Sequence, residues 1–258
     1  MSLESSGSKK FKDSALWETF KIIIQALILA MVVRIFFYQP FNIPSGSMKS
    51  TLLVGDYLFV SKLSYGYSKY SFPIDLGLFD GRVFEGKPER GDVAVFKLPR
   101  DNATDYIKRV VGLPGDTVQM RDGVLFINGT AVPKVRDGSF KTRDDDGRLV
   151  EIPRFRETLP NGVEHYTLDE EQNGPADNTR EYKVPEGHYF MMGDNRDNST
   201  DSRVQWGGVD FVPYENLVGR ADLVFFSAAF DEPDSFRMLT PWQWPFDIRW
   251  HRFFQTVE

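Results

Sequence analysis

The chain has 258 residues, a net charge of −6 and a pI near 5.3, and it contains no cysteine. Its length allows one large β domain or two smaller ones, and its acidic balance argues against a nucleic-acid partner. The lack of cysteine excludes disulfides, thiolate catalysis and cysteine-ligated metals. The histidines His165, His188 and His251 are not at the spacing of metal ligands, so we expect no metal, no cofactor and no Ser-His-Asp triad.

A long apolar run follows a short polar tail. Residues 1–15 are rich in lysine and predict a cytoplasmic tail without regular structure. Residues 16–39 predict a transmembrane anchor, because Trp17 to Tyr38 would form a helix of about 33 Å, which is enough to cross the apolar core of a bilayer. More lysines precede the run than follow it, which favours a cytoplasmic N-terminus and an extracytoplasmic remainder.

Two alternatives to a membrane span stay open. A buried or interfacial helix is one, because Glu18, Lys21 and Arg34 shorten the clean apolar stretch to about half a span. A cleavable signal peptide is the other. Its first small-x-small site would be Ser45–Ser47, and cleavage there would destroy the serine motif described below. We therefore favour an uncleaved anchor.

Beyond Pro40 the pattern changes to short segments typical of β-strands. Residues 56–63, 92–98 and 106–111 are rich in β-branched and aromatic side chains and are bounded by glycine or proline. Residues 65–90 form an aromatic-rich excursion that either rests on the membrane face or packs on its own core. The sequence therefore predicts a mainly β protein.

The second half of the chain predicts an insertion in this β core. Residues 117–185 contain two hairpin turns of the Asp-Gly and Asn-Gly type and then a strongly charged stretch, in which the acidic run 144–146 is typical of a solvated loop. We expect an antiparallel catalytic core from residues 40–116 and 186–258, with residues 117–185 as an inserted second β subdomain. The Trp-, Phe- and Arg-rich tail at residues 241–254 suits either a membrane-surface segment or a strand-end cap.

Candidate chemistry begins with Ser45 and Ser47, just after the apolar run. A serine nucleophile needs a base and donors for the oxyanion. Lys108 is a candidate base, because strand alternation sends it and Arg109 to opposite faces, and a guanidinium cannot act as a base. Lowering its pKa from about 10.4 to about 8 would cost roughly 3 kcal/mol, which burial could impose. A surface lysine is the alternative for Lys108, and we expect the competing lysine, Lys49, to be solvated.

A polar loop at residues 193–203, GDNRDNSTDSR, is the third element. The spacing of its oxygens does not fit a calcium loop, because an arginine or a glycine falls where a ligand is required. A loop that orients other groups is the better interpretation, with Ser199 as a hydrogen-bond partner for a lysine amine. The expected ion pairs are Asp201 with Arg203 or Asp197 with Arg109.

Four of these stretches, PSGSM with TLLVGD, RGDVAVFKLP, YIKRVVGLPGD and GHYFMMGDNRDNSTDSR, resemble in order and spacing the boxes of bacterial type I signal peptidase. The resemblance covers roughly residues 16–118 and 184–227. It implies a serine endopeptidase with a Ser-Lys dyad on an antiparallel β fold, held in the bacterial cytoplasmic membrane by one helix, that removes signal peptides from exported preproteins. Lys49-Ser50 departs from the family, whose members often have a proline at the second position.

The resemblance also implies a role for individual residues. Ser47 would be the nucleophile, Lys108 the general base, Ser45 a side-chain oxyanion donor and Ser199 the group that orients Lys108. The implied cleft has shallow pockets for small residues at the −1 and −3 positions of a signal peptide and is formed by Phe41, Ile43, Met48, Leu52, Val95, Tyr106 and Ile107. Structural support would come from Arg109, Asp197, Asp201 and Arg203, and the implied partners are preprotein signal peptides and the lipid bilayer.

Other functions remain as alternatives. A non-catalytic, membrane-tethered β module for envelope assembly leaves the Ser-Lys-Ser combination unexplained. A self-cleaving Ser-Lys repressor would need a DNA-binding domain that the short tail cannot hold. Penicillin-binding chemistry requires S-x-x-K on a helix, and that spacing was found only from Ser6 to Lys9.

Overall fold

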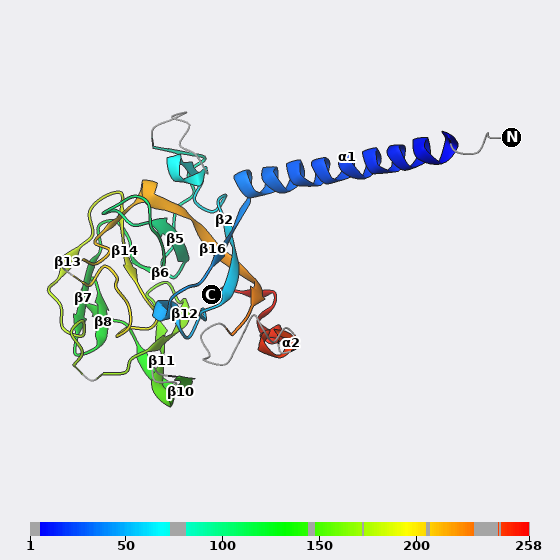
Figure 1. Cartoon of the computed structure of the whole chain (residues 1–258). Helices are drawn as coiled ribbons and strands as arrows, with labels where there is room; N and C mark the ends of the chain where they lie inside the picture. Colours follow the sequence, from blue (N-terminus) through cyan, green and yellow to red (C-terminus); the bar gives the residue numbers. More distant parts are fainter. Residues whose placement is uncertain are drawn as a thin grey trace.

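The computed structural model describes residues 6–72, 81–143, 148–171, 173–204, 207–229, 242 and 244–257. The predicted acidic loop at 144–146 and parts of the aromatic excursion and of the C-terminal tail lie outside these residues. One long helix, α1 (Ser6–Phe36), projects from a β-rich body (Figure 1). The prediction of a mainly β protein with an N-terminal apolar helix is confirmed.

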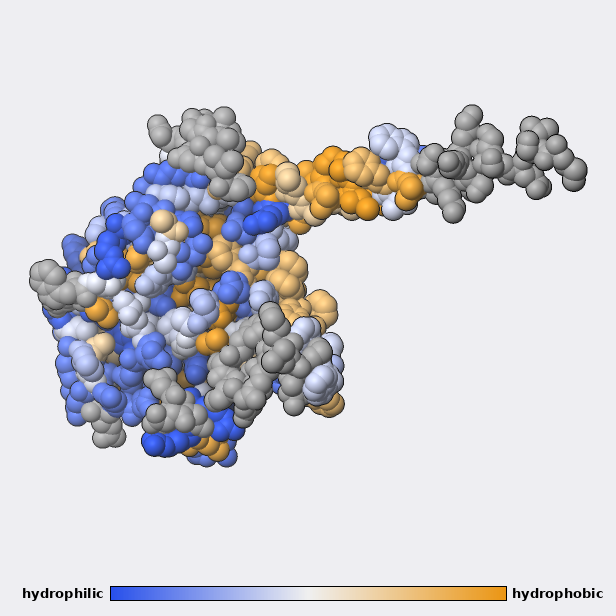
Figure 2. All heavy atoms as spheres, in the orientation of Figure 1, coloured by the Kyte–Doolittle hydropathy of each residue, from blue (hydrophilic) through white to orange (hydrophobic). Residues whose placement is uncertain are grey.

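Helix α1 carries the apolar run. Its segment Leu16–Phe36 has a mean hydropathy of 2.1 and is long and apolar enough to cross a membrane, and none of this window is buried. Figure 2 shows it as an apolar rod outside the body. Its apolar side chains have no protein cover among the described residues, which fits a helix that crosses a membrane. The prediction of an irregular tail is wrong for residues 6–15, because the helix begins at Ser6; lysine is a good helix former and allows this extension.

The main sheet is antiparallel and has eight strands. Its order is β1-β2-β16-β5-β6-β14-β15, with β17 paired to β16. The strands are β1 (Tyr38–Asn42), β2 (Asp56–Ser61), β5 (Val93–Lys97), β6 (Asp105–Gly112), β14 (His188–Met192), β15 (Val212–Pro213), β16 (Leu217–Ser227) and β17 (Gln255–Thr256). The three strands expected in the first half of the chain are therefore confirmed as β2, β5 and β6.

Two further sheets come from the segment predicted to be an insertion. One has the order β13-β7-β8-β9, and the other has the order β10-β11-β12. Their strands are β7 (Thr117–Arg121), β8 (Val124–Ile127), β9 (Thr130–Ala131), β10 (Lys134–Arg143), β11 (Leu149–Thr158), β12 (Glu164–Leu168) and β13 (Tyr182–Lys183). Both predicted hairpin turns are present, and Asp122 and Asn128 have positive φ angles of 48° and 53°, as type I′ turns require. Val118 and Leu125 share an apolar cluster with Val111 and Phe190 of the main sheet, so the subdomain boundary stays a prediction.

The aromatic excursion at residues 65–90 contains both buried and exposed rings, so part of it packs in a core and part is free to meet a surface. Tyr65 is 1% exposed and packs in a core cluster with Phe96 and Val110, whereas Phe84 is 81% exposed. The remaining short elements are β3 (Tyr67–Ser68), β4 (Arg82–Val83), α2 (Trp244–Asp247) and the 3₁₀ turns η1 (Gly46–Met48), η2 (Lys69–Ser71), η3 (Tyr214–Asn216) and η4 (Trp250–Arg252).

Candidate active site

The turn that carries Ser45 and Ser47 is anchored by neighbouring side chains that pack in the apolar core. Strand β1 ends at Asn42, and η1 follows within a few residues, with Ser47 buried. Met48 and Leu52 are fully buried in the apolar cluster formed by the β2, β5 and β16 side chains. Because these two side chains lie under the turn, rotation of the Ser47 backbone would expose apolar surface to water.

The departure at Lys49-Ser50 fits the local backbone. Ser50 has a φ of 95°, and its Oγ donates a hydrogen bond of 2.8 Å to the carbonyl of Tyr166. Proline fixes φ near −65° and has no side-chain donor, so it could not adopt this conformation or make this bond. Ser50 therefore ties the end of the turn that carries Ser45 and Ser47 to β12.

Lys108 meets the serine turn from β6. Its Nζ lies 2.5 Å from the Oγ of Ser47, and the residue is only 3% exposed. Burial lowers the pKa of Lys108 from 10.5 to about 8, although the nearby carboxylates of Asp201 and Asp194 oppose the shift. The alternative of a surface lysine is therefore wrong, and a substantial neutral fraction exists near pH 8.

The competing lysine, Lys49, points elsewhere. Its Nζ donates a 3.1 Å hydrogen bond to Oγ1 of Thr142 on β10, and the residue is half-buried. The expectation that Lys49 is simply solvated is wrong, because the long β10–β11 hairpin reaches the serine turn and supplies an acceptor.

Two further hydroxyls lie near the Ser47–Lys108 pair. The Oγ of Ser45 is 3.5 Å from the Oγ of Ser47, and Ser45 is exposed. The Oγ of Ser199 is buried and has no hydrogen-bond partner among the described residues, so the predicted hydrogen bond from Ser199 to Lys108 is not formed in this structure. The hydroxyl instead lies against Gly193, where an added Cβ would be 2.2 Å from it.

The polar loop after β14 supports the site through buried ion pairs. Arg109 binds Asp194 with two hydrogen bonds of 2.8 and 2.9 Å, and both side chains are buried. The predicted pair of Arg109 with Asp197 is therefore wrong. Asp194 lies just beyond the end of β14, which pairs with β6, whereas Asp197 has turned away and accepts from the backbone of Glu170 and Glu171.

The other predicted ion pair is present. Arg203 donates to Asp201 over 2.8 to 2.9 Å, and Asp201 also accepts from the backbone N–H of Gly193 at 3.0 Å. Arg109 and Arg203 hold the pKa values of Asp194 and Asp201 below the ordinary range despite complete burial. Both carboxylates therefore stay ionised beside Lys108.

The sequence interpretation missed Asn195, which binds the backbone of the serine turn. The side-chain amide of Asn195 donates to the carbonyl of Gly46 at 3.0 Å, and its backbone N–H donates to the carbonyl of Ser47 at 3.0 Å. The DN pair after β14 was a signal, but only the fold reveals that Asn195 faces residues 149 and 148 positions earlier.

The Ser47–Lys108 pair opens into a cavity of about 630 Å³. Five residues of the predicted cleft line it, namely Phe41, Ile43, Val95, Tyr106 and Ile107, together with Ser45, Ser47, Lys108 and Ser199. The prediction that Met48 and Leu52 line the cleft is wrong, because both lie in the core beneath it. The polar loop also lines the cavity and contributes Asp197.

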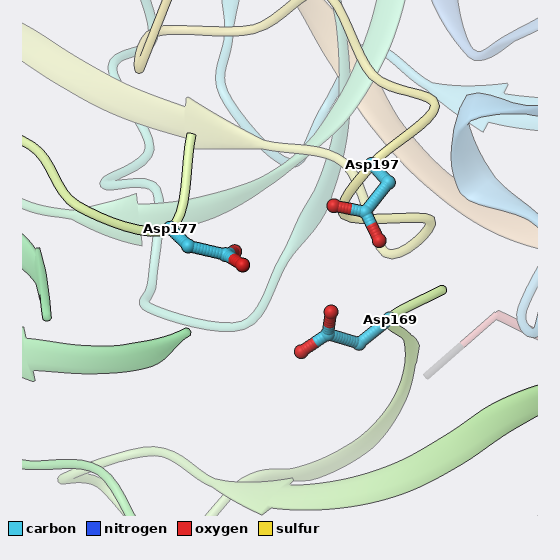
Figure 3. Close-up of side chains that lie close together, drawn as sticks. All are labelled: Asp169, Asp177 and Asp197. Carbon is cyan, nitrogen blue, oxygen red and sulfur yellow. The ribbon is translucent and has the colours of Figure 1, made fainter. Parts of the chain in front are cut away.

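Three carboxylates gather beside this cavity, and one of them, Asp197, also lines it. Figure 3 shows Asp169, Asp177 and Asp197 facing a shared space, and their oxygens lie within 4.8 Å of one another. Burial and the two neighbouring carboxylates raise the pKa of Asp177. Lys134 contacts Asp169, and backbone N–H groups donate to the other two, so the protein's own donors offset the repulsion. The geometry could accept a cation, but these bonds account for the cluster without one.

Comparison with known proteins identifies the family. Residues 16–226 match the family described as signal peptidase, peptidase S26. The chain belongs to this family. A signal peptidase I of Rickettsia typhi is 44% identical over 209 residues, which cover 78% of this chain and 76% of that protein. A signal peptidase I of Rickettsia bellii is 39% identical over 256 residues, which cover 93% and 84%.

A crystal structure of a signal peptidase I from Enterococcus faecalis is 29% identical and covers 52% of this chain and 96% of that one, with a TM-score of 0.31 that is too low to bear on the fold. Membership in the S26 family confirms the resemblance found in the sequence and makes the chain a serine peptidase. The alternative of a non-catalytic envelope module is therefore wrong.

Proposed function

We propose that this S26 peptidase removes N-terminal signal peptides from exported preproteins through a Ser47–Lys108 dyad and an acyl-enzyme. The observation that carries the proposal is the 2.5 Å separation between Lys108 Nζ and Ser47 Oγ at the wall of a large cavity. A buried amine with a pKa of about 8 is neutral often enough to accept the proton of a serine hydroxyl at working pH.

The reaction follows from these positions. A preprotein's extended cleavage region lies between residues 41–48 and 105–108 and pairs with them main chain to main chain. Neutral Lys108 accepts the Ser47 proton as Oγ attacks the scissile carbonyl, and the ammonium then protonates the leaving amine. Water next attacks the acyl-enzyme, with Lys108 again as the base.

Ser45 and the backbone N–H of Ser47 are the proposed donors to the oxyanion. The Ser45 hydroxyl lies 3.5 Å from the nucleophile and is free to rotate toward a bound carbonyl. A donor of this kind is typically worth about 10² to 10³ in rate. Ser199 is the proposed orienting group for Lys108, and its buried, unpartnered hydroxyl leaves it able to accept from the ammonium once substrate is bound.

The same cavity supports the proposed preference for small residues at −1 and −3. Its apolar wall is made by Phe41, Ile43, Val95, Tyr106 and Ile107, most of them large side chains that leave shallow pockets beside the dyad. Apolar pockets of this kind discriminate between side chains mainly by size.

Attachment to the bacterial cytoplasmic membrane completes the proposal. Helix α1 would span the bilayer with its lysine-rich N-terminus in the cytoplasm and would place the β body outside. The aromatic residues Trp250 and Phe254, which are 61% and 72% exposed, suit contact with the membrane surface.

The test is cleavage of a purified preprotein by the detergent-solubilised full chain, with N-terminal sequencing of the product. We expect one new N-terminus that follows small residues at −1 and −3, and no cleavage by Ser47→Ala or Lys108→Met. Wild-type-like cleavage by either variant would contradict the dyad. Incubation of the protein alone shows whether Ser45–Ser47 is itself a cleavage site.

A further inference from the structure

The C-terminal end of α1 is bound to the β body by a buried lysine. The Nζ of Lys62, just after β2, donates to the carbonyls of Arg34 and Ile35 over 3.1 and 3.4 Å and also contacts the carbonyl of Ser71. The backbone N–H of Lys62 donates to the carbonyl of Phe37 at 3.0 Å. Lys62 is 1% exposed, so its three N–H groups have three carbonyl acceptors within the protein.

A tyrosine completes the end of the helix. The hydroxyl of Tyr67 donates to the carbonyl of Phe36, and the two rings meet edge to face with centroids 6.4 Å apart. The carbonyl of Val33 accepts from the N–H of Phe37 at 2.9 Å. An α-helix leaves its last four carbonyls without intrahelical N–H partners. Here all four have donors, and two side chains of the β body supply three of them.

The contact of the α1 C-terminus with Lys62 and Tyr67 is called the α1 joint here. The chain runs from this joint through one strand to Ser47. Strand β1 begins at Tyr38, only two residues after α1 ends, and it pairs with β2 from Tyr38 opposite Ser61 to Asn42 opposite Tyr57. The backbone of Ile43 continues this pairing with Asp56. No unpaired linker therefore separates the end of the helix from the strand that runs into the catalytic turn.

We propose that Lys62 and Tyr67 are positioning residues that dock the C-terminus of α1 rigidly on the β body, and so fix the orientation of the Ser47 site relative to the membrane. This inference rests on the proposed function, because it concerns how the same site reaches a signal peptide held in a bilayer. A cation at the C-terminal carbonyls also complements the helix dipole, and these carbonyls need partners near lipid. The joint matters for a membrane-held preprotein and not for a peptide that diffuses into the cavity.

The test compares two substrates with the full chain reconstituted in vesicles. One substrate is a preprotein whose signal peptide is inserted in the same vesicles, and the other is a short soluble peptide with small residues at −1 and −3. The variants are Lys62→Met, which keeps the apolar stem and removes the donors, and Tyr67→Phe, which removes one hydroxyl. Lys87→Met, an exposed lysine on the same excursion, is the matched control.

We expect the two joint variants to lose about tenfold in preprotein cleavage and to keep peptide cleavage within about twofold, because a site about 1 Å out of place loses rate steeply. Lys87→Met should match wild type on both substrates. Equal losses on the two substrates would overturn the proposal and indicate a general structural role. Failure of the wild type to cleave either substrate would count against the proposed function.

A second measurement does not depend on activity. The chain has no cysteine, so spin labels at Leu29→Cys on α1 and Glu89→Cys on the body are the only thiol labels. Both positions are exposed. A rigid joint predicts a narrow distance distribution in vesicles that broadens in Lys62→Met. A distribution already broad in the parent, or unchanged by the substitution, would overturn the proposal.

Discussion

Lys108 and Lys62 are both buried lysines, but their amines face different groups: a serine hydroxyl beside a cavity for Lys108, and backbone carbonyls for Lys62. Both are almost fully buried, and burial lowers the pKa of each to about 8. Lys62 faces three backbone carbonyls, which only accept hydrogen bonds, so its amine needs all three protons to bond all of them. Lys108 faces the hydroxyl of Ser47, which can give up a proton, and it borders the cavity. A lowered lysine pKa thus reports burial, and the neighbouring atoms decide whether the amine acts as a base or as a clamp.

The largest expected effect separates the two lysines directly. Lys108→Met should lower cleavage of a soluble peptide by about 10⁴-fold, at the upper end of general-base effects, because Lys108 is the one amine or carboxylate bonded to Ser47 Oγ among the described residues. Lys62→Met should stay within about twofold in the same assay. The measurement is kcat/KM in detergent, with circular dichroism to verify folding. A loss of similar size in both variants would contradict the prediction that Lys108 is the base and that Lys62 only binds the end of α1.

The second prediction concerns the tight packing on the Lys108 side. In Gly193→Ala the new Cβ would lie 2.2 Å from the Oγ of Ser199 and 2.6 Å from the carbonyl of Ser47. One or both serines must move, and we expect kcat to fall by about 10²-fold, as for a misplacement of roughly 1 Å. The double variant Gly193→Ala/Ser199→Gly relieves the first clash but also removes the hydroxyl proposed to orient Lys108, so its rate should not exceed that of Ser199→Gly alone. Unchanged kcat in Gly193→Ala would show that this packing is not needed.

The third prediction uses pH to assign the base. Below its pKa Lys108 is protonated and cannot accept the Ser47 proton, so kcat/KM for the peptide should fall about tenfold for each pH unit below 8 and level off above it. Since Lys62 also titrates near 8, the wild-type profile alone does not identify the base. Lys62→Met should keep the same midpoint. A midpoint that shifts in this variant would assign the titration to Lys62 instead.

The parts of the molecule that local patterns specify were predictable from the sequence. The apolar run predicted α1, and β-branched and aromatic segments bounded by glycine or proline predicted β2, β5 and β6. Residue chemistry made Lys108 a candidate base, and the resemblance to the signal peptidase boxes paired it with Ser47. Burial of Lys108 could be expected because Ile107 and Val110 flank it in a strand. The helix and the strands depend on residues close together in the chain, whereas Ser47 and Lys108 are 61 positions apart.

The supporting contacts depend on how distant strands pair and were not predictable. Arg109 binds Asp194 and not Asp197, because the register of β6 with β14 decides which carboxylate reaches the guanidinium. Likewise, nothing near Lys62 in the sequence indicates that its amine meets the end of a helix 27 residues earlier.

The smallest expected effect concerns Lys49, the lysine nearest to Ser47 in sequence. Its amine is bonded to Thr142 on β10 and not to Ser47, so Lys49→Met should change peptide kcat/KM by no more than about twofold. The pH profile should keep its midpoint near 8 for the same reason. Thr142→Val, which removes the acceptor and keeps the shape, is the matched control and should behave alike. A large loss in Lys49→Met that Thr142→Val does not share would contradict this prediction. It would indicate that the Lys49 amine, and not only Lys108, acts on Ser47.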